Sequence, residues 1–169
     1  MYLTFKRKKG IPIYCHWSVT IIFLVVLFIN GFSIIDAVLS WVSYLILIFI
    51  HELGHCFFAR RAGIEVSAIS LSALGGACHA GFSETKKDAL LFYSGGLLFQ
   101  VILLFLSILI VMIIPESIAE HLKPVLVVFI HINIVLFFMN IIPSQLPGGA
   151  ATDGKQIFRV IFNRDSADT

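Results

Sequence analysis

The stretch FIHELGHCFFARRAGI, residues 49–64, places three ionisable side chains inside a long apolar segment. His51 and His55 are four residues apart, so on a helix both imidazoles project from one face, one turn apart. This spacing lets two histidines bind one Zn²⁺, and in HExxH sites the intervening glutamate, here Glu52, moves the proton of the attacking water. Each charged residue at membrane depth costs about 2.5–3.5 kcal/mol on insertion scales, so such residues tend to be kept for function. The stretch therefore predicts a metal site within an apolar helix.

The composition around this stretch is that of a membrane protein. Of the 169 residues, 59% are hydrophobic and 13% are charged, and the mean hydropathy is +0.97. This apolar fraction is far larger than a soluble domain needs to fill its core. We therefore expect an all-α polytopic membrane protein with about four transmembrane helices, forming one domain over residues 1–169. The apolar runs place these helices at about 11–30, 34–61, 88–114 and 124–142.

Between the second and third helices the pattern changes from helical to strand-like. The alternating apolar residues Ile64, Val66, Ile69 and Leu71 are followed by Gly75-Gly76, which predicts a short membrane-associated β-hairpin at about 64–82. Its backbone must be covered by protein wherever it enters lipid. After the fourth helix we expect a C-terminal loop and a short helix over 143–164.

The basic residues predict an orientation. Of the 12 lysines and arginines, only Lys123 falls outside when both termini are cytoplasmic and the chain crosses four times. The basic cluster at 6–9 before an apolar run is also typical of a signal peptide, but no small-residue cleavage site follows, which favours a retained helix. We expect a prokaryotic plasma membrane, with the metal site toward the cytoplasmic side. The net charge of +2 then reflects topology and does not indicate nucleic-acid binding.

The cysteines form no CxxC pair. By this topology Cys15, Cys56 and Cys78 all lie in or near the inner half of the membrane. Disulfides are not expected on the reducing side of the membrane, and small buried apolar residues are the simplest interpretation.

Several motifs together resemble the site-2 protease family, the intramembrane zinc metalloproteases. HELGHCFFARRAGI is similar to the end of that family's HExxH helix. FFMNIIPSQLPGGAATDGKQIF, residues 137–158, resembles the family's Asn-x-x-Pro segment leading to Asp-Gly. Gly75-Gly76 and SGGLLFQ, residues 94–100, also look like family elements. The resemblance covers about residues 40–160, and with no PDZ-like insertion it points to the compact branch, similar to the sporulation-factor protease.

The resemblance implies roles for individual residues. His51, His55 and Asp153 would bind one Zn²⁺, Glu52 would be the catalytic base, and Asn140 would bind the oxyanion of the scissile carbonyl. The hairpin residues expected to contact substrate are Gly75, Gly76 and His79.

One departure concerns the third metal ligand. The loop from Pro143 to Asp153 is longer than in the commonest family pattern, and Gly148 and Gly149 would let it fold back to the metal. Glu120, Asp165 or a ligand from a partner chain remain as alternatives to Asp153.

The function that this implies is an intramembrane zinc endopeptidase. It would hydrolyse a peptide bond in or next to a transmembrane segment of a membrane protein or signal-peptide-like substrate in the lipid bilayer. A regulatory membrane protein or a second copy of the chain is a further possible partner. One alternative is an inactive relative that binds transmembrane helices without cutting them. A small membrane transporter is less favoured, since its paired repeats are not visible.

Overall fold

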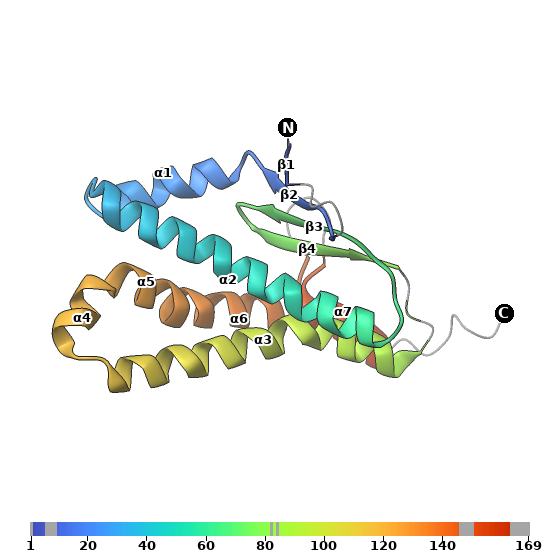
Figure 1. Ribbon diagram of the computed structural model, residues 1–169. Helices are drawn as coiled ribbons and strands as arrows, with labels where there is room; N and C mark the ends of the chain where they lie inside the picture. Colours follow the sequence, from blue (N-terminus) through green and yellow to red (C-terminus); the bar gives the residue numbers. More distant parts are fainter. Residues whose placement is uncertain (1, 6–9, 82, 84, 146–150, 163–169) are drawn as a thin grey trace.

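The computed structural model describes every residue except 1, 6–9, 82, 84, 146–150 and 163–169. Long helices lie side by side, with a small sheet along one of them (Figure 1). The helices, in chain order, are α1 (Val19–Ile29), α2 (Ile34–Arg61), α3 (Lys86–Ile113), α4 (Glu116–His121), α5 (Lys123–Val127), a π-helical turn (Val128–Ile132), α6 (Asn133–Ile141) and α7 (Asp153–Phe162).

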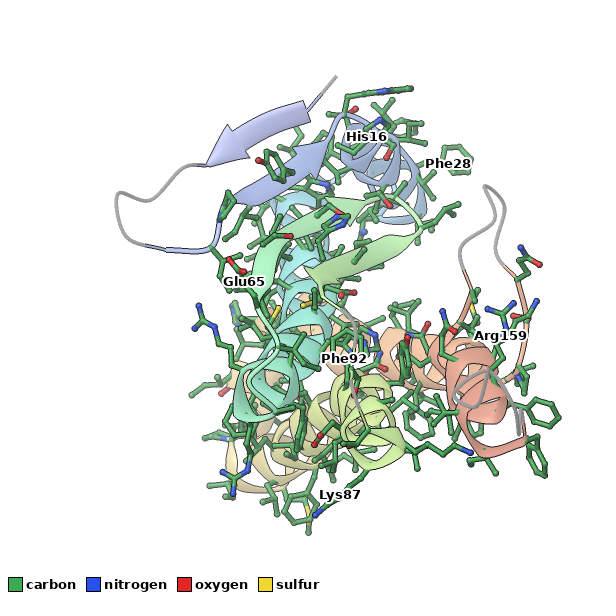
Figure 2. The ribbon with its side chains drawn as sticks, turned by 90° about the vertical axis from the view of Figure 1, so that its right-hand side faces the viewer. His16, Phe28, Glu65, Lys87, Phe92 and Arg159 are labelled. Carbon is green, nitrogen blue, oxygen red and sulfur yellow. The ribbon has the colours of Figure 1, made fainter. Side chains whose placement is uncertain are left out.

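Three of the described helical segments are long and apolar enough to cross a membrane. They are α2, α3 and the continuous segment Lys123–Ile141, which joins α5, the π-helical turn and α6. Many of their large apolar side chains are exposed, as lipid-facing residues are. In Figure 2, Phe28 likewise points outward at the periphery, whereas Phe92 lies in the interior. The expected helical membrane protein is thus confirmed.

The first apolar segment differs from the predicted helix at 11–30. Ile13–His16 form a strand, and α1 begins only at Val19 and has 11 residues. At 1.5 Å per residue such a helix is about 16 Å long, roughly half of the hydrocarbon core. A window of hydropathy does not distinguish a short apolar strand from a helix, which explains the error. The molecule therefore has three full-length candidate spans and one short apolar helix.

The predicted hairpin is present and belongs to a larger sheet. The strands β1 (Tyr2–Phe5), β2 (Ile13–His16), β3 (Val66–Ser72) and β4 (Gly75–Ala80) are ordered β1-β2-β3-β4. β2 runs parallel to β3, and the other pairs are antiparallel. Residue 82, the end of the expected hairpin, lies outside the described residues. Since β4 pairs only with β3 among the described strands, it forms an edge of the sheet.

Helix α2 is the centre of the packing. Its residues Ile48 and Cys56 form a buried cluster with Ile69 and Leu71 of β3. On its other side, Gly54 lies against Gly95 of α3, where a Cβ on either glycine would overlap the backbone of the other helix. The two glycines therefore let α2 and α3 approach closely enough to share one site.

Helix α7 (Asp153–Phe162) lies within the 143–164 segment. It follows the fourth expected span and returns to lie beside α3, in the half of the long helices nearer the sheet (Figure 1). Residues 163 and 164 lie outside the described part of the chain.

Candidate metal centre

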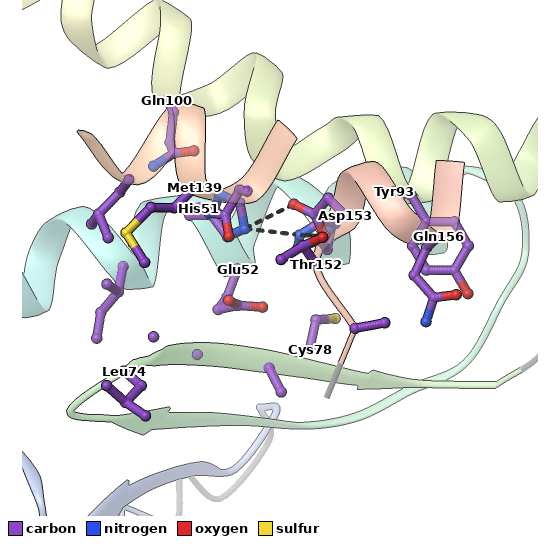
Figure 3. A pocket seen from close by; sticks show the side chains of 18 of the residues that line it. His51, Glu52, Leu74, Cys78, Tyr93, Gln100, Met139, Thr152, Asp153 and Gln156 are labelled. Carbon is purple, nitrogen blue, oxygen red and sulfur yellow. Dashed lines mark hydrogen bonds and ion pairs between the residues drawn. The ribbon is translucent and has the colours of Figure 1, made fainter. Parts of the chain in front are cut away.

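Two histidines of α2 and one aspartate of α7 lie close together in one cleft (Figure 3). The Nε2 atoms of His51 and His55 are 3.1 Å apart. Asp153 directs Oδ2 to His51 Nε2 at 3.2 Å and Oδ1 to His55 Nε2 at 3.4 Å. One ligand atom of each residue lies within 4.8 Å of the others. Two imidazoles and a carboxylate at this separation can hold one divalent transition-metal ion and leave a position open.

The surroundings of the histidines fit a cation. His55 Nδ1 donates a hydrogen bond to the Phe92 carbonyl at 2.7 Å, which leaves the lone pair of Nε2 toward Asp153. A Cβ on Gly96 would lie 2.5 Å from His55 Nε2 and from His51 Cε1, so only glycine leaves room for both rings. Asp153 Oδ2 is buried and accepts no hydrogen bond from the described residues. A metal ion bound to this buried oxygen would compensate the free energy that its burial costs.

The longer loop before Asp153 is closed at its base by Thr152. The Thr152 hydroxyl donates to the Ile142 carbonyl at 2.8 Å and accepts from the Ser144 N–H at 3.0 Å. Gln145 and Ala151 form a bridge just beyond. Whatever path the loop takes, its two ends are held together, and Asp153 begins α7 beside the histidines. Gly148 and Gly149, expected to let the loop fold back, lie outside the described residues.

Electrostatics keep Asp153 ionised. Burial alone would raise the pKa of its carboxyl group, but the neighbouring imidazoles of His51 and His55 outweigh this and lower it to about 2. The carboxylate also lies in the first turn of α7, where the partial positive charge of the helix N-terminus favours an anion.

Glu52 lies between the histidines and strand β4. Its side chain is 3% exposed and points from α2 toward the hairpin (Figure 3). A Cβ on Gly76 would lie 2.5 Å from Glu52 Cγ and 2.7 Å from Oε1, so the glycine is needed for this contact. The backbone of Cys78 is within hydrogen-bonding reach of the carboxylate. The hairpin therefore fixes the position of Glu52.

A cleft of about 350 Å³ joins these groups. Most of the predicted site residues line it, namely His51, Glu52, His55, Gly75, Gly76, Asn140 and Asp153.

His79 is the exception. It is exposed, and its Nε2 lies 2.9 Å from Ser70 Oγ, away from the cleft. Successive side chains of a strand point to opposite faces, so Cys78 faces the cleft and its neighbour His79 does not.

The alternative third ligands do not reach the histidines in the described part of the chain. Glu120 is exposed in α4, 3.8 Å from Lys123, at the far end of the long helices (Figure 1). Asp165 lies outside the described residues.

Sequence reasoning did not assign several residues that build the site. The sequence does contain a signal for Thr152, because a threonine directly before an acidic first turn is a common N-cap. The Phe92 group that orients His55 is a backbone carbonyl, which no residue type reveals. Gln100, the last residue of the SGGLLFQ stretch, is 1% exposed and lines the cleft.

Comparisons with known proteins agree with this architecture. No family model matches the chain. The zinc metalloprotease MJ0392 of Methanocaldococcus jannaschii is 29% identical over 164 residues, which make up 94% of this chain and 44% of the relative. The chain thus spans less than half the length of this curated relative. A solved structure, the site-2 protease from Methanocaldococcus jannaschii, superimposes with a TM-score of 0.73 at 21% identity, covering 95% of this chain and 71% of that one. The resemblance to the site-2 protease family is therefore confirmed, and the chain has the site-2 protease fold.

Proposed function

We propose that this chain is an intramembrane zinc endopeptidase that hydrolyses a peptide bond in or next to a transmembrane segment of a membrane protein or signal-peptide-like substrate. The observation that carries the proposal is the meeting of His51, His55 and Asp153 within 4.8 Å, with Glu52 beside them in one cleft. The similarity to a protein named zinc metalloprotease supports the choice of metal and reaction. An inactive relative would not need Asp153 beside the histidines.

Each residue has a role in this reaction. His51, His55 and Asp153 hold the zinc ion. When bound, zinc supplies a Lewis acid that polarises the scissile carbonyl and makes water more acidic. Glu52 accepts the proton of the attacking water and delivers it to the leaving amine. Asn140, which lines the same cleft, donates a hydrogen bond to the developing oxyanion.

The substrate binds as an extended strand. A helix hides its peptide bonds in its own hydrogen bonds, so the substrate must unwind before cleavage. The free edge of β4 offers backbone groups to the unwound segment by strand addition. Gly75 and Gly76 carry no side chain that would keep this segment from Glu52.

The same proposal includes an orientation in the membrane. With both termini in the cytoplasm, the metal centre lies toward the cytoplasmic side, where water is available. This orientation rests on the distribution of basic residues described above.

The direct test is Glu52→Gln. The amide keeps the shape of the side chain but does not accept a proton, so we expect zinc content and fold to be kept while cleavage falls by about 10²–10⁴-fold. Purified protein in lipid vesicles with tagged signal-peptide-like segments, followed by mass spectrometry of the products, measures this. Glu65→Gln, the same change at an exposed position of the hairpin entry, is the matched control and should cleave normally. Cleavage by Glu52→Gln at the unmodified rate would refute the assignment.

A further inference from the structure

Two cysteines outside the metal ligands lie in contact beside the cleft. Cys56 on α2 and Cys78 on β4 have their Sγ atoms 2.6 Å apart, and both are free thiols. This separation is well inside the van der Waals distance of two sulfurs and only about 0.6 Å beyond the length of a disulfide bond. The two sulfurs therefore need to approach each other only slightly to be joined.

The two thiols differ in access. Cys56 is 3% exposed. Cys78 is half-buried and lines the cleft, so a small solute that enters the cleft reaches it first. The accessible sulfur meets an oxidant first, and the buried sulfur in contact with it is placed to resolve the product.

We propose that Cys56 and Cys78 form a reversible disulfide that latches strand β4 to helix α2. The third cysteine, Cys15, lies on β2 and takes no part. Disulfides on the reducing side of a membrane are usually transient and redox-sensing, so with the proposed cytoplasmic orientation the pair is reduced at rest and closes under oxidation. The inference rests on that orientation for its resting state and does not depend on the proposed protease activity.

The oxidant is a peroxide. The Cys78 sulfur attacks one peroxide oxygen, the O–O bond breaks, and the second oxygen leaves as water, which gives a sulfenic acid. The Cys56 sulfur then attacks the Cys78 sulfur, the S–O bond breaks, and the hydroxyl leaves as water with the Cys56 proton. In sum, two thiols lose two electrons and two protons to one peroxide, which yields a disulfide and two waters. A dithiol restores both thiols by exchange.

The disulfide would restrict the movement of the hairpin. Cys56 is one helical turn after Glu52, on the face that β4 covers. Gly76, two residues before Cys78, already contacts the Glu52 side chain. A bond at this point holds the edge strand against α2 and prevents it from moving away from Glu52.

The test uses the full chain, purified with reductant, in lipid vesicles. After treatment with hydrogen peroxide, remaining thiols are alkylated and the protein is mapped without reduction. We expect one cross-linked peptide pair containing Cys56 and Cys78, an intact mass lower by two hydrogens before alkylation, alkylated Cys15, and full reversal by dithiothreitol. Hydrogen exchange of the β4 amides should slow on oxidation. Cys15→Ala should behave in the same way as the unmodified chain.

Other results would overturn the proposal. These are a bridge that involves Cys15 or two chains, oxidation of Cys78 to sulfinic acid with Cys56 still alkylated, or no loss of thiols. The double variant Cys56→Ala/Cys78→Ala should show no change of β4 exchange with peroxide. A slowing of exchange in that variant would assign the effect to another group. Because the main readout is made on the unmodified protein, the outcome does not depend on how well the variants fold.

Discussion

Asp153 is the residue on which the proposed metal centre depends most. It lies 3.2 Å from His51 and 3.4 Å from His55, although 97 residues of chain lie between it and the second histidine. A pair of histidines on one helix leaves a metal ion with too few protein ligands, and in the proposed centre the carboxylate would supply the third, together with a negative charge opposite the cation. Its low pKa keeps that charge present at any physiological pH.

We therefore expect Asp153→Asn to lose zinc. A neutral amide oxygen is a poorer ligand, so zinc affinity should fall by more than the roughly 10–100-fold that changes in outer hydrogen-bond partners cost. Metal analysis of the purified variant measures this. Asp36→Asn, at the other end of α2, makes the same change away from the site and should keep its zinc. Unaltered zinc content in Asp153→Asn would send the search to Asp165 or to a partner chain.

At the scale of elements, the loop base and the hairpin position the two functional carboxylates. Thr152 joins the ends of the loop before α7 and so sets where Asp153 begins. Strand β4, through Gly76, sets where the Glu52 side chain lies. Neither the loop base nor the hairpin contains a predicted metal ligand, since Asp153 is the first residue of α7. Substitutions in these two elements therefore test positioning separately from metal binding.

Thr152→Val tests the loop base. Valine has the same shape but leaves the Ser144 N–H without its partner, which costs about 1–3 kcal/mol. We expect lower thermal stability and weaker zinc binding, with recovery of both in Thr152→Ser. Thr20→Val removes an exposed hydroxyl of α1 that bonds only to the Trp17 carbonyl, and should change neither. Equal zinc affinity in Thr152→Val and the unmodified chain would contradict a positioning role.

Gly76→Ala tests the hairpin. The new methyl group would lie 2.5 Å from Glu52 Cγ, so the glutamate or the strand must shift, and overpacking of this kind typically costs about 1–3 kcal/mol. We expect loss of cleavage with zinc retained. At Gly81, in the same hairpin, an added Cβ meets its nearest atom at 3.6 Å, so Gly81→Ala should be tolerated. Normal cleavage by Gly76→Ala would show that the contact with Glu52 is not needed.

At the scale of the whole molecule, the arrangement of the ends is consistent with the expected orientation. β2 pairs with β3, so the N-terminal segment lies on the same side as the hairpin. The turn before α2 and helix α4 lie together at the opposite end of the long helices (Figure 1). This places Lys123, the one basic residue expected outside, at that opposite end.

Reporter fusions test this orientation. A reporter after Thr169, which lies outside the described residues, should be cytoplasmic, and one near Ser117 in α4 should be external, because basic residues stay on the cytoplasmic side. A reporter at the N-terminus should also be cytoplasmic if α1, with the extended residues before it, completes a crossing. The reverse pattern would place the metal centre toward the external face.

The sequence by itself determined the membrane class, the three long helices, the hairpin and the pair of histidines one turn apart on α2. Each of these features is indicated by a short stretch of sequence. The length of the apolar runs indicates the spans, and alternating apolar residues followed by Gly75-Gly76 indicate the hairpin. The four-residue spacing of His51 and His55 indicates the pair. Only the tertiary structure decided that Ile13–His16 is a strand, because a short apolar run satisfies either conformation until β3 supplies its hydrogen bonds. It also brought Asp153 to the histidines through the Thr152 base, turned His79 away, and set Cys56 against Cys78, since contacts between distant segments depend on packing that no local pattern encodes.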